Sequence, residues 1–267
     1  VIQDYSDDLE RVNAGSFADE DEFKGGDQLV VGGYKTVVDL LARGLDVRLS
    51  SAVSAVASDA RGVRVTSKSG VTTADAAIVT LPLGVLASGA VTFSPALPAA
   101  KAAALSSLKM GLLDKIVMTF DSVWWPAEHD LFALERAKPG APMYFLDLAK
   151  PLGQPVLVTF LAGSVARAME KRSDAEVTAE TLTALRGAFA QAPAPRHAIV
   201  TRWAADPFAR GAYSVVPPDA SRALGRRVGS TDYTELAFKG GHIGIYVSGR
   251  AQREVPPAIH QWLRARD

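Results

Sequence analysis

The sequence predicts a protein of the α/β to α+β class, with a β-rich first part, a mixed middle part and a short α/β tail. Its 267 residues are 48% hydrophobic, which is enough to bury a substantial core. Between residues 47 and 80, short apolar runs alternate with polar residues and are separated by glycines, a pattern typical of hairpins. After residue 97, helical and strand patterns follow one another, as in α/β or α+β domains.

The first part begins with a short apolar run at 28–31, which predicts a strand, and continues with a helical pattern at 34–44. Gly44 is expected to cap this helix. Gly62 and Gly70 are expected at the corners of hairpins. The predicted strands of this part are 47–49, 53–57, 63–67 and 76–80, of which the last is unusually apolar.

The middle part is predicted to contain a helix at 99–108, a turn at Gly111 and a long strand at 112–120. Ser173 is a plausible N-cap for a helix at 177–189. Further strands are expected at 143–147, 155–161 and 197–203, and the tail is expected to form a helix at 220–228, strands at 234–238 and 243–247, and a helix at 256–264.

Composition excludes several function classes. Lys and Arg together number 29, as do Asp and Glu, so no net charge attracts nucleic acid or an anionic membrane. The absence of cysteine excludes disulfides, thiolate metal sites and a cysteine nucleophile. No apolar run reaches the ~18–20 residues of a membrane span, and the acidic start lacks the features of a signal peptide. We therefore expect a cytoplasmic protein, and the non-methionine start suggests a trimmed or partial chain.

Several common catalytic motifs are absent from the chain. It contains no G-x-G-x-x-G turn for a dinucleotide, no P-loop lysine motif and no G-x-S-x-G nucleophile elbow. His129 and His260 lack the close spacing of metal ligands, so no metal site is predicted.

Lys115 lies in the otherwise apolar strand pattern "GLLDKIVMTF". Burying an ammonium group costs several kcal/mol unless it is paired or faces a cavity. The pattern alone favours a lysine that snorkels to solvent or pairs with Asp114, and a functional ammonium facing a cavity is the alternative.

Trp203 and Tyr213 bracket the segment "WAADPFARGAY", which passes from a strand into a loop. Aromatic side chains in such a loop can line a site for a flat ligand or a cationic amine. The pattern alone favours the other interpretation, which is ordinary packing in a core.

Several ordered motifs give the chain a family resemblance over about residues 1–214. They include "DEFKGGDQLVVGGY", "ADAAIVTLPLGVL", "MGLLDKIVMTFDSVWW" and "VTRWAADPFARGAYS". This part resembles the flavin-containing amine oxidases, a group that includes polyamine and monoamine oxidases and flavin-dependent histone demethylases. The resemblance implies FAD as the cofactor, a small-molecule amine as the substrate, and oxidation to an imine with release of hydrogen peroxide.

The resemblance also implies roles for individual residues. Lys115 matches the family's lysine that holds a water near flavin N5 and would be the catalytic residue. Trp203 matches a tryptophan packed by the flavin, and Tyr213 matches an aromatic side of the substrate cage. The implied cofactor contacts are Val53, Thr80, Leu81, Pro82 and Trp203.

The family's glycine-rich FAD-binding unit has no counterpart in this sequence, and we expect it in a segment before residue 1 or in a separate partner. We therefore expect weak FAD binding by the chain alone. The resemblance divides the chain into a partial FAD-binding subdomain at 1–90 and a mixed-sheet substrate-binding subdomain at 91–214, followed by a tail at 215–267.

The tail has a different resemblance. Residues 216–267, including "FKGGHIGIYVSG", look like the C-terminus of polyhydroxyalkanoate synthases, which are acyltransferases of the α/β-hydrolase fold with a Cys-Asp-His triad. His242 matches their general base, but the chain contains no cysteine. A lone imidazole cannot carry out acyl transfer, so His242 would be vestigial. A chimera joined near residues 214–217 is expected, and an acyltransferase remnant or a non-enzymatic product are the alternative functions.

Overall fold

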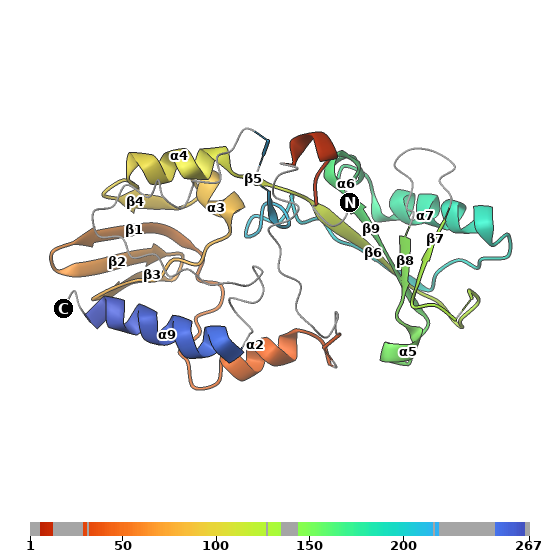
Figure 1. Ribbon diagram of the computed structural model, residues 1–267, viewed down its shortest axis with the longest axis horizontal. Helices are drawn as coiled ribbons and strands as arrows, with labels where there is room; N and C mark the ends of the chain where they lie inside the picture. The colour runs from red at the N-terminus through yellow and green to blue at the C-terminus, as the bar shows by residue number, and fades with distance from the viewer. Residues whose placement is uncertain are drawn as a thin grey trace.

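The computed structural model describes residues 6–12, 29–30, 32–126, 128–134, 144–215, 217–218 and 249–264. These residues form two units of mixed strands and helices that lie end to end (Figure 1). The first unit contains a four-stranded sheet and the second a five-stranded sheet. The predicted class, mixed strands and helices, is confirmed at this level.

The sheet of the first unit has the strand order β3-β2-β1-β4. An antiparallel meander joins β1, β2 and β3, and β4 lies parallel to β1. Gly62 and Gly70 begin β2 and β3 with φ of 121° and 125°, a backbone region that glycine enters without strain. The strands are β1 (Val53–Asp59), β2 (Gly62–Ser67), β3 (Gly70–Ala74) and β4 (Thr92–Ser94).

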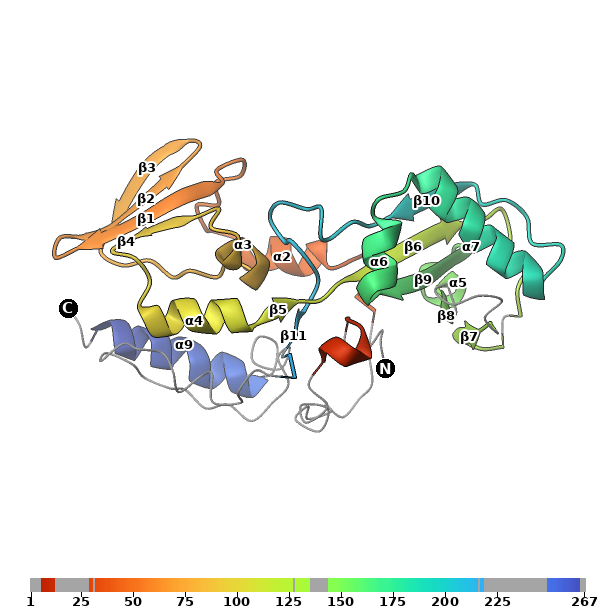
Figure 2. The same cartoon turned by 90° about the horizontal axis from the view of Figure 1, so that it is seen from above.

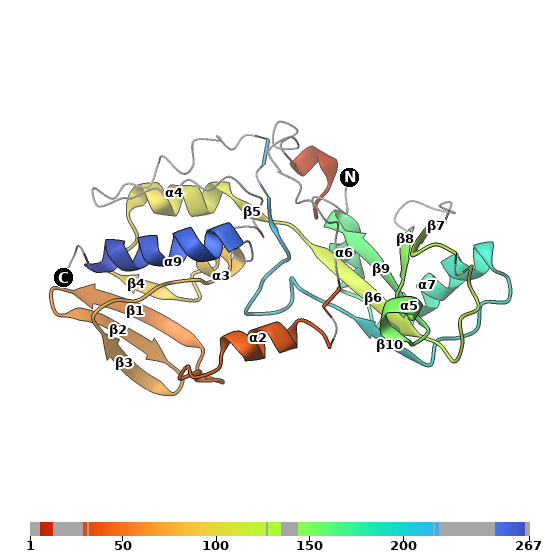
Figure 3. The same cartoon turned by 60° about the horizontal axis from the view of Figure 1, so that its bottom comes forward.

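The helices of the first unit are α2 (Lys35–Leu41), α3 (Leu83–Ala87) and α4 (Ala99–Ser107). Figure 3 shows α2 on one side of the molecule, between the two units. Ala42 is the C-cap of α2, so the prediction of Gly44 as the cap is wrong. Gly44 follows two residues later in a left-handed conformation with φ of 76°, in the turn after the helix. The α2 and α4 predictions from the sequence are confirmed.

Two predicted strands of the first unit are wrong. Residues 47–49 and 76–80 have no strand structure, and Leu29 and Val30 of the predicted first strand are also outside any strand. Leu49 and Ile78 are exposed, and neither run is paired with a strand in the described part of the chain. Strand-like composition is not enough without a neighbouring strand to satisfy the backbone hydrogen bonds.

The second unit has an antiparallel sheet with the strand order β10-β6-β9-β8-β7. β9 is a nearly continuous apolar run, whereas β6 combines apolar residues with Asp114 and Lys115. The two strands pair along their whole length, from Leu113 opposite Ala162 to Thr119 opposite Val156. The strands are β6 (Leu113–Thr119), β7 (Leu131–Ala133), β8 (Tyr144–Asp147), β9 (Val156–Ala162) and β10 (His197–Val200).

The helices of the second unit are α5 (Ala149–Leu152), α6 (Gly163–Met169) and α7 (Asp174–Ala188). Contacts join α7 to β10 and α6 to β9 and β6, and Figure 2 shows both helices lying along the sheet. The helix α7 starts with a capping box, in which Glu176 N–H donates to Ser173 Oγ at 3.3 Å and Ser173 N–H donates to Glu176 Oε2 at 2.9 Å. Ser173 is therefore the N-cap that the sequence predicted, although the helix begins three residues earlier than expected.

The hydrophobic core lies in the second unit. Its buried residues all fall between Leu112 and Val200 and include Ile116, Met118 and Phe145. Within residues 32–107 of the first unit, by contrast, only Val85 and Val91 are buried apolar residues. The first unit therefore has little apolar packing of its own.

Two short antiparallel strands join the units: β5 (Lys109–Met110), just before β6, and β11 (Ser214–Val215). Gly111 N–H donates to the Tyr213 carbonyl at 2.9 Å, and Ala212 N–H donates to the Gly111 carbonyl at 3.0 Å. A short 3-10 helix, η1 (Leu9–Arg11), lies beside this crossing, where the Ser6 carbonyl accepts from Leu112 N–H.

Beyond residue 218, the tail is described only as α9 (Gly249–Arg264), with Pro256 and Pro257 inside the helix. The predicted helix at 256–264 is thus confirmed and begins earlier. The predicted elements at 220–228, 234–238 and 243–247 lie outside the described residues, as does His242. Within the described ranges, no helix is long and apolar enough to cross a membrane.

Candidate active site

Lys115 lies in the middle of β6, in a part of the strand that is otherwise largely buried. Its side chain is exposed on one face of the sheet, whereas Asp114 and Ile116 on either side of it are fully buried on the other face. The two side chains of the predicted Lys115–Asp114 pair therefore point in opposite directions, and that pairing is wrong.

The surroundings of the Lys115 ammonium are aromatic. Phe160 on β9 is its direct cross-strand partner, and Lys115 Nζ lies 6.0 Å from the centre of the Phe160 ring. Among the described residues, no carboxylate forms an ion pair with this ammonium. Within the described ranges, the Lys115 ammonium is therefore placed where it can donate to a water molecule or a polar ligand on this face.

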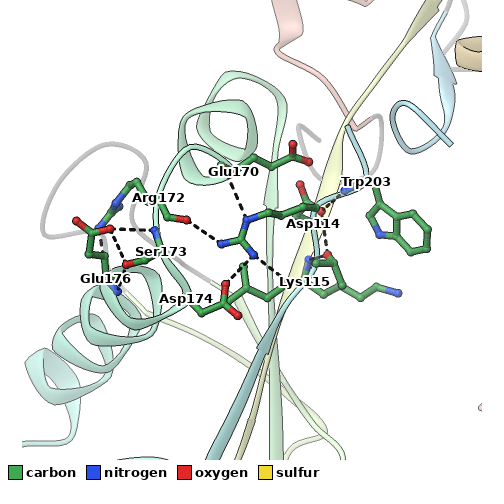
Figure 4. A network of polar contacts seen from close by, with 11 residues as sticks. Asp114, Lys115, Glu170, Arg172, Ser173, Asp174, Glu176 and Trp203 are labelled. Atoms are coloured by element: carbon green, nitrogen blue, oxygen red, sulfur yellow. Dashed lines mark hydrogen bonds and ion pairs between the residues drawn. The ribbon is translucent and has the colours of Figure 1, made fainter. Parts of the chain in front are cut away.

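Trp203 follows β10, and its indole ring projects to the same side of β6 as the Lys115 side chain (Figure 4). The two residues are linked through Thr201, because Lys115 N–H donates to Thr201 Oγ1 at 2.8 Å and Thr201 N–H donates to the Lys115 carbonyl at 3.0 Å. Trp203 is 40% exposed. The core-packing interpretation of this residue is therefore wrong.

Tyr213 ends the same loop and is 53% exposed, so core packing is wrong for this residue as well. Its φ of 63° is in the left-handed region, which is uncommon for residues other than glycine. Gly211 N–H donates to the Trp203 carbonyl at 2.8 Å, and the Tyr213 carbonyl accepts from Gly111 N–H. The loop that carries Trp203 and Tyr213 is therefore closed on itself and fixed to the start of β6.

Asp114 lies beneath this loop on the buried face of β6, with 0% of its surface exposed. Its Oδ1 accepts from the Thr201 hydroxyl at 2.8 Å and from Trp203 N–H at 3.1 Å. Burial raises the pKa of Asp114 to about 6, with a smaller increase from the nearby Glu170 carboxyl, although the bonds from Thr201 and Trp203 act in the opposite direction.

Glu170 directly follows α6 and binds the next amide of the loop, since Ala204 N–H donates to Glu170 Oε1 at 2.8 Å. Its backbone carbonyl accepts from Arg202 Nε at 3.3 Å. Figure 4 shows the Asp114 and Glu170 side chains near each other, on the side of the Trp203 backbone away from the indole ring.

The predicted cofactor contacts at Thr80, Leu81 and Pro82 lie just before α3. Thr80 and Pro82 are exposed, and Leu81 is half-buried. A Cβ added to Gly84 would lie 2.8 Å from both the Ala209 carbonyl oxygen and Arg210 Cβ. The start of α3 therefore packs directly against the loop that carries Trp203 and Tyr213.

Val53 is half-buried at the start of β1, where it is opposite Ser67. It thus belongs to the sheet of the first unit, whereas Lys115 and Trp203 belong to the second. The structure brings Lys115 and Trp203 together and fixes Tyr213 and the start of α3 to the same loop, but Val53 lies apart from this group in the other sheet.

These residues suit one end of a flavin better than the other. The exposed aromatic rings of Trp203 and Tyr213 and the exposed ammonium of Lys115 are suitable for a flat ring system with polar edges and for a bound water. In the described part of the chain, however, no glycine-rich strand-to-helix turn of the kind that binds a pyrophosphate is found. The described residues therefore fit the ring end of FAD.

The sequence alone did not indicate Phe160, Thr201 or Glu170. Thr201 and Asp114 are 87 positions apart, and nothing in the local pattern around Glu170 marks it. The one available signal was Asp114 itself, an acidic residue in an apolar strand pattern, which needs a buried polar partner.

Comparison with known proteins identifies the family. Residues 8–261 match the model of the family described as flavin containing amine oxidoreductase. The chain is 35% identical over 256 residues to polyamine oxidase 4 of Oryza sativa subsp. japonica, a match that covers 92% of the chain and 52% of the relative. It is 34% identical over 272 residues to histone demethylase-like protein A of Aspergillus fumigatus, covering 89% of the chain and 25% of that protein.

A solved structure of wild-type putrescine oxidase bound to putrescine has a similar fold. Its TM-score is 0.62 at 21% identity, over 73% of this chain and 44% of that one. The family match continues past residues 214–217, where the sequence predicted a junction. The resemblance of the tail to an acyltransferase stays a prediction.

The chain spans about half the length of the polyamine oxidase that it matches over most of its own residues. Family membership rests on the match to residues 8–261, which is far more than half of the chain, and it implies FAD as the cofactor. The chain belongs to the flavin-containing amine oxidoreductase family.

Proposed function

We propose that the chain supplies the amine-binding face of an FAD-dependent amine oxidase that acts on polyamine-type substrates. The observation that carries the proposal is the position of Lys115 and Trp203 side by side on the exposed face of β6, next to the loop of Tyr213. The polyamine oxidase and putrescine oxidase relatives support an aliphatic amine as the substrate class.

In this proposal the chain positions and desolvates the amine. The exposed rings of Trp203 and Tyr213 form apolar sides for an alkyl amine, and removal of water favours its neutral form. The Lys115 ammonium holds a water molecule by donating a hydrogen bond to it, and Phe160 limits the movement of the lysine side chain. When bound, FAD supplies the acceptor for the hydride that leaves the amine carbon.

A partner segment that binds the rest of FAD is also part of the proposal. The first unit exposes six large apolar side chains on α2 and the loop after it, and each would contribute about 1.5–3 kcal/mol if it were fully buried. An apolar surface of this kind is typical of an interface. The exposed residues are Val38, Leu40, Leu41, Leu45, Val47 and Leu49.

The test uses Lys115→Met in the chain combined with the glycine-rich FAD-binding segment of a related polyamine oxidase. We expect the wild-type mixture to release hydrogen peroxide from spermidine or putrescine, and Lys115→Met to lower the rate by on the order of 100-fold. Lys109→Met is the matched control, because Lys109 is an exposed lysine on β5 whose ammonium donates only to the Ser106 carbonyl among the described residues.

Equal rates in Lys115→Met and Lys109→Met would refute the role of Lys115. The chain without the added segment is expected to bind FAD weakly, which a flavin fluorescence titration measures. Stoichiometric FAD in the purified chain would contradict that expectation.

A further inference from the structure

Two successive amides of the Trp203 loop are bound by two different carboxyl groups. Trp203 N–H donates to Asp114 on β6, and Ala204 N–H donates to Glu170 after α6. These bonds fasten the loop to a strand and to a helix at the same point. The backbone of Trp203 is therefore held from the buried side of the sheet, opposite the face where Lys115 is exposed (Figure 4).

The second carboxyl oxygen of Asp114, Oδ2, needs a hydrogen-bond partner because it is buried. Asp114 Oδ1 already accepts two hydrogen bonds, whereas Asp114 Oδ2 is buried and accepts none from the described N–H and hydroxyl donors. The neighbouring group is the Glu170 carboxyl. Two ionised carboxylates in contact repel each other, but one proton between them gives a strong hydrogen bond.

We propose that Asp114 and Glu170 share one proton and together act as positioning residues that hold the Trp203 backbone against β6. The proton lies between Asp114 Oδ2 and the Glu170 carboxyl, and each acid keeps its bond to the loop. Loss of this proton leaves two negative charges beneath the loop. Their repulsion outweighs the stronger hydrogen bond that an ionised Asp114 accepts from Trp203 N–H, and the loop loosens. Because Thr201 links Asp114 to the Lys115 amide, the same event reaches Lys115.

No cation in the described part of the chain replaces the proton. The guanidinium of Arg202 is bound to the Glu170 and Arg172 carbonyls and to Asp174 Oδ1, the last at 2.6 Å. Arg172 is paired with Glu180. The Lys115 ammonium is on the other face of β6, so Glu170 is the charged group that acts on Asp114.

The experiment follows the backbone amides of Trp203 and Ala204 by ¹H–¹⁵N NMR between pH 4 and 8, with the flavin-free chain. Both amides are expected to titrate together with a midpoint at about pH 6, as the pKa of Asp114 implies. In Asp114→Asn, the pH-dependent change in chemical shift that the two amides share is expected to be lost from both. In Glu170→Gln the midpoint at Trp203 falls, because the charge that raises the pKa of Asp114 is removed.

Amide hydrogen exchange gives a second measurement. The asparagine in Asp114→Asn can accept from Trp203 and donate to Glu170, so it mimics the protonated pair at every pH. At pH 8 the Trp203 and Ala204 amides are expected to exchange several-fold more slowly in this variant than in the wild type. Asp206→Asn is the control, because Asp206 lies in the same loop and accepts from Phe208 N–H rather than facing the pair.

Independent titration of the two amides, or the same exchange rates in Asp114→Asn and the wild type, would overturn the proposal. The importance of Trp203 for an amine substrate rests on the proposed function. The titration itself needs neither FAD nor amine, so its outcome is separate from any loss of oxidase activity.

Discussion

At the scale of single residues, the buried acid Asp114 links stability to pH. Its pKa is raised in the folded chain from 3.8 to about 6, so the folded state binds more protons than the unfolded state between these values. The stability contribution is therefore fully present below pH 4 and is lost as the pH rises through 6. Urea unfolding from pH 4 to 7 should show this loss in the wild type and a flatter profile in Asp114→Asn, and equal profiles would contradict it.

Gly163 offers a second prediction at this scale. It has φ of 58°, and an added Cβ would lie 2.5 Å from Asp8 Oδ1 and 2.8 Å from the Asp8 amide nitrogen. Gly153 has a similar φ of 63° but no atom within 4 Å of such a Cβ. Gly153→Ala should cost about 1 kcal/mol from backbone strain, and Gly163→Ala about 1–3 kcal/mol more, because Asp8 must move.

Chemical denaturation of both glycine variants measures this difference, since their shared backbone strain cancels. Asp8 also accepts from the Ser164 amide at 3.1 Å and from its hydroxyl at 2.9 Å. Equal losses in the two variants would show that the segment of Asp8 contributes nothing to the stability of α6.

At the scale of elements, the capping box of α7 is open to direct measurement. Ser173→Ala removes the side-chain oxygen that accepts from Glu176 N–H, and it should lower stability by about 1 kcal/mol at pH 7. Hydrogen bonds from Ser173 also lower the pKa of Glu176. The stability that these bonds contribute is therefore fully present above the usual pKa of a glutamate and is lost as the pH falls through the lowered pKa. The difference in melting temperature between the wild type and Ser173→Ala should therefore become smaller in acid. A difference that stays constant with pH would contradict this account.

Elements were predictable where the local pattern and the packing agree. β6 and β9 are long, largely apolar strands that pair with each other, and the N-cap of α7 has its capping-box glutamate. The exposed polar strand β3 was missed because it has no apolar face to give a period. The prediction of a strand at residues 76–80 was wrong for the opposite reason, because an apolar composition indicates burial but does not supply a partner strand.

The site was only partly readable from the sequence. Family resemblance suggested Lys115, Trp203 and Tyr213, whereas pattern alone favoured a snorkelling lysine and two core aromatics. The Asp114–Glu170 pair was out of reach, since local periodicity says nothing about which distant acids meet across a strand and a helix.

At the scale of the whole molecule, the uneven distribution of buried side chains predicts that backbone amides are protected from hydrogen exchange to different degrees in the two units. The described core cluster lies in the second unit, while β3 of the first unit is exposed along its whole length. Hydrogen-exchange mass spectrometry should find amides of β6 and β9 at least about tenfold slower to exchange than those of β2 and β3. Both pairs are antiparallel ladders, so equal rates would mean that burial does not govern local opening here.

The crossing of β5–β6 with residues 211–215 has a mechanical consequence. In the part of the chain that the structure describes, two segments pass between the units side by side, and they are bonded to each other through Gly111, Ala212 and Tyr213. A single connecting segment would allow one unit to rotate relative to the other. Two segments that are hydrogen-bonded to each other resist this rotation. The connection therefore keeps the start of α3 in the first unit and Lys115 in the second unit at a constant relative position.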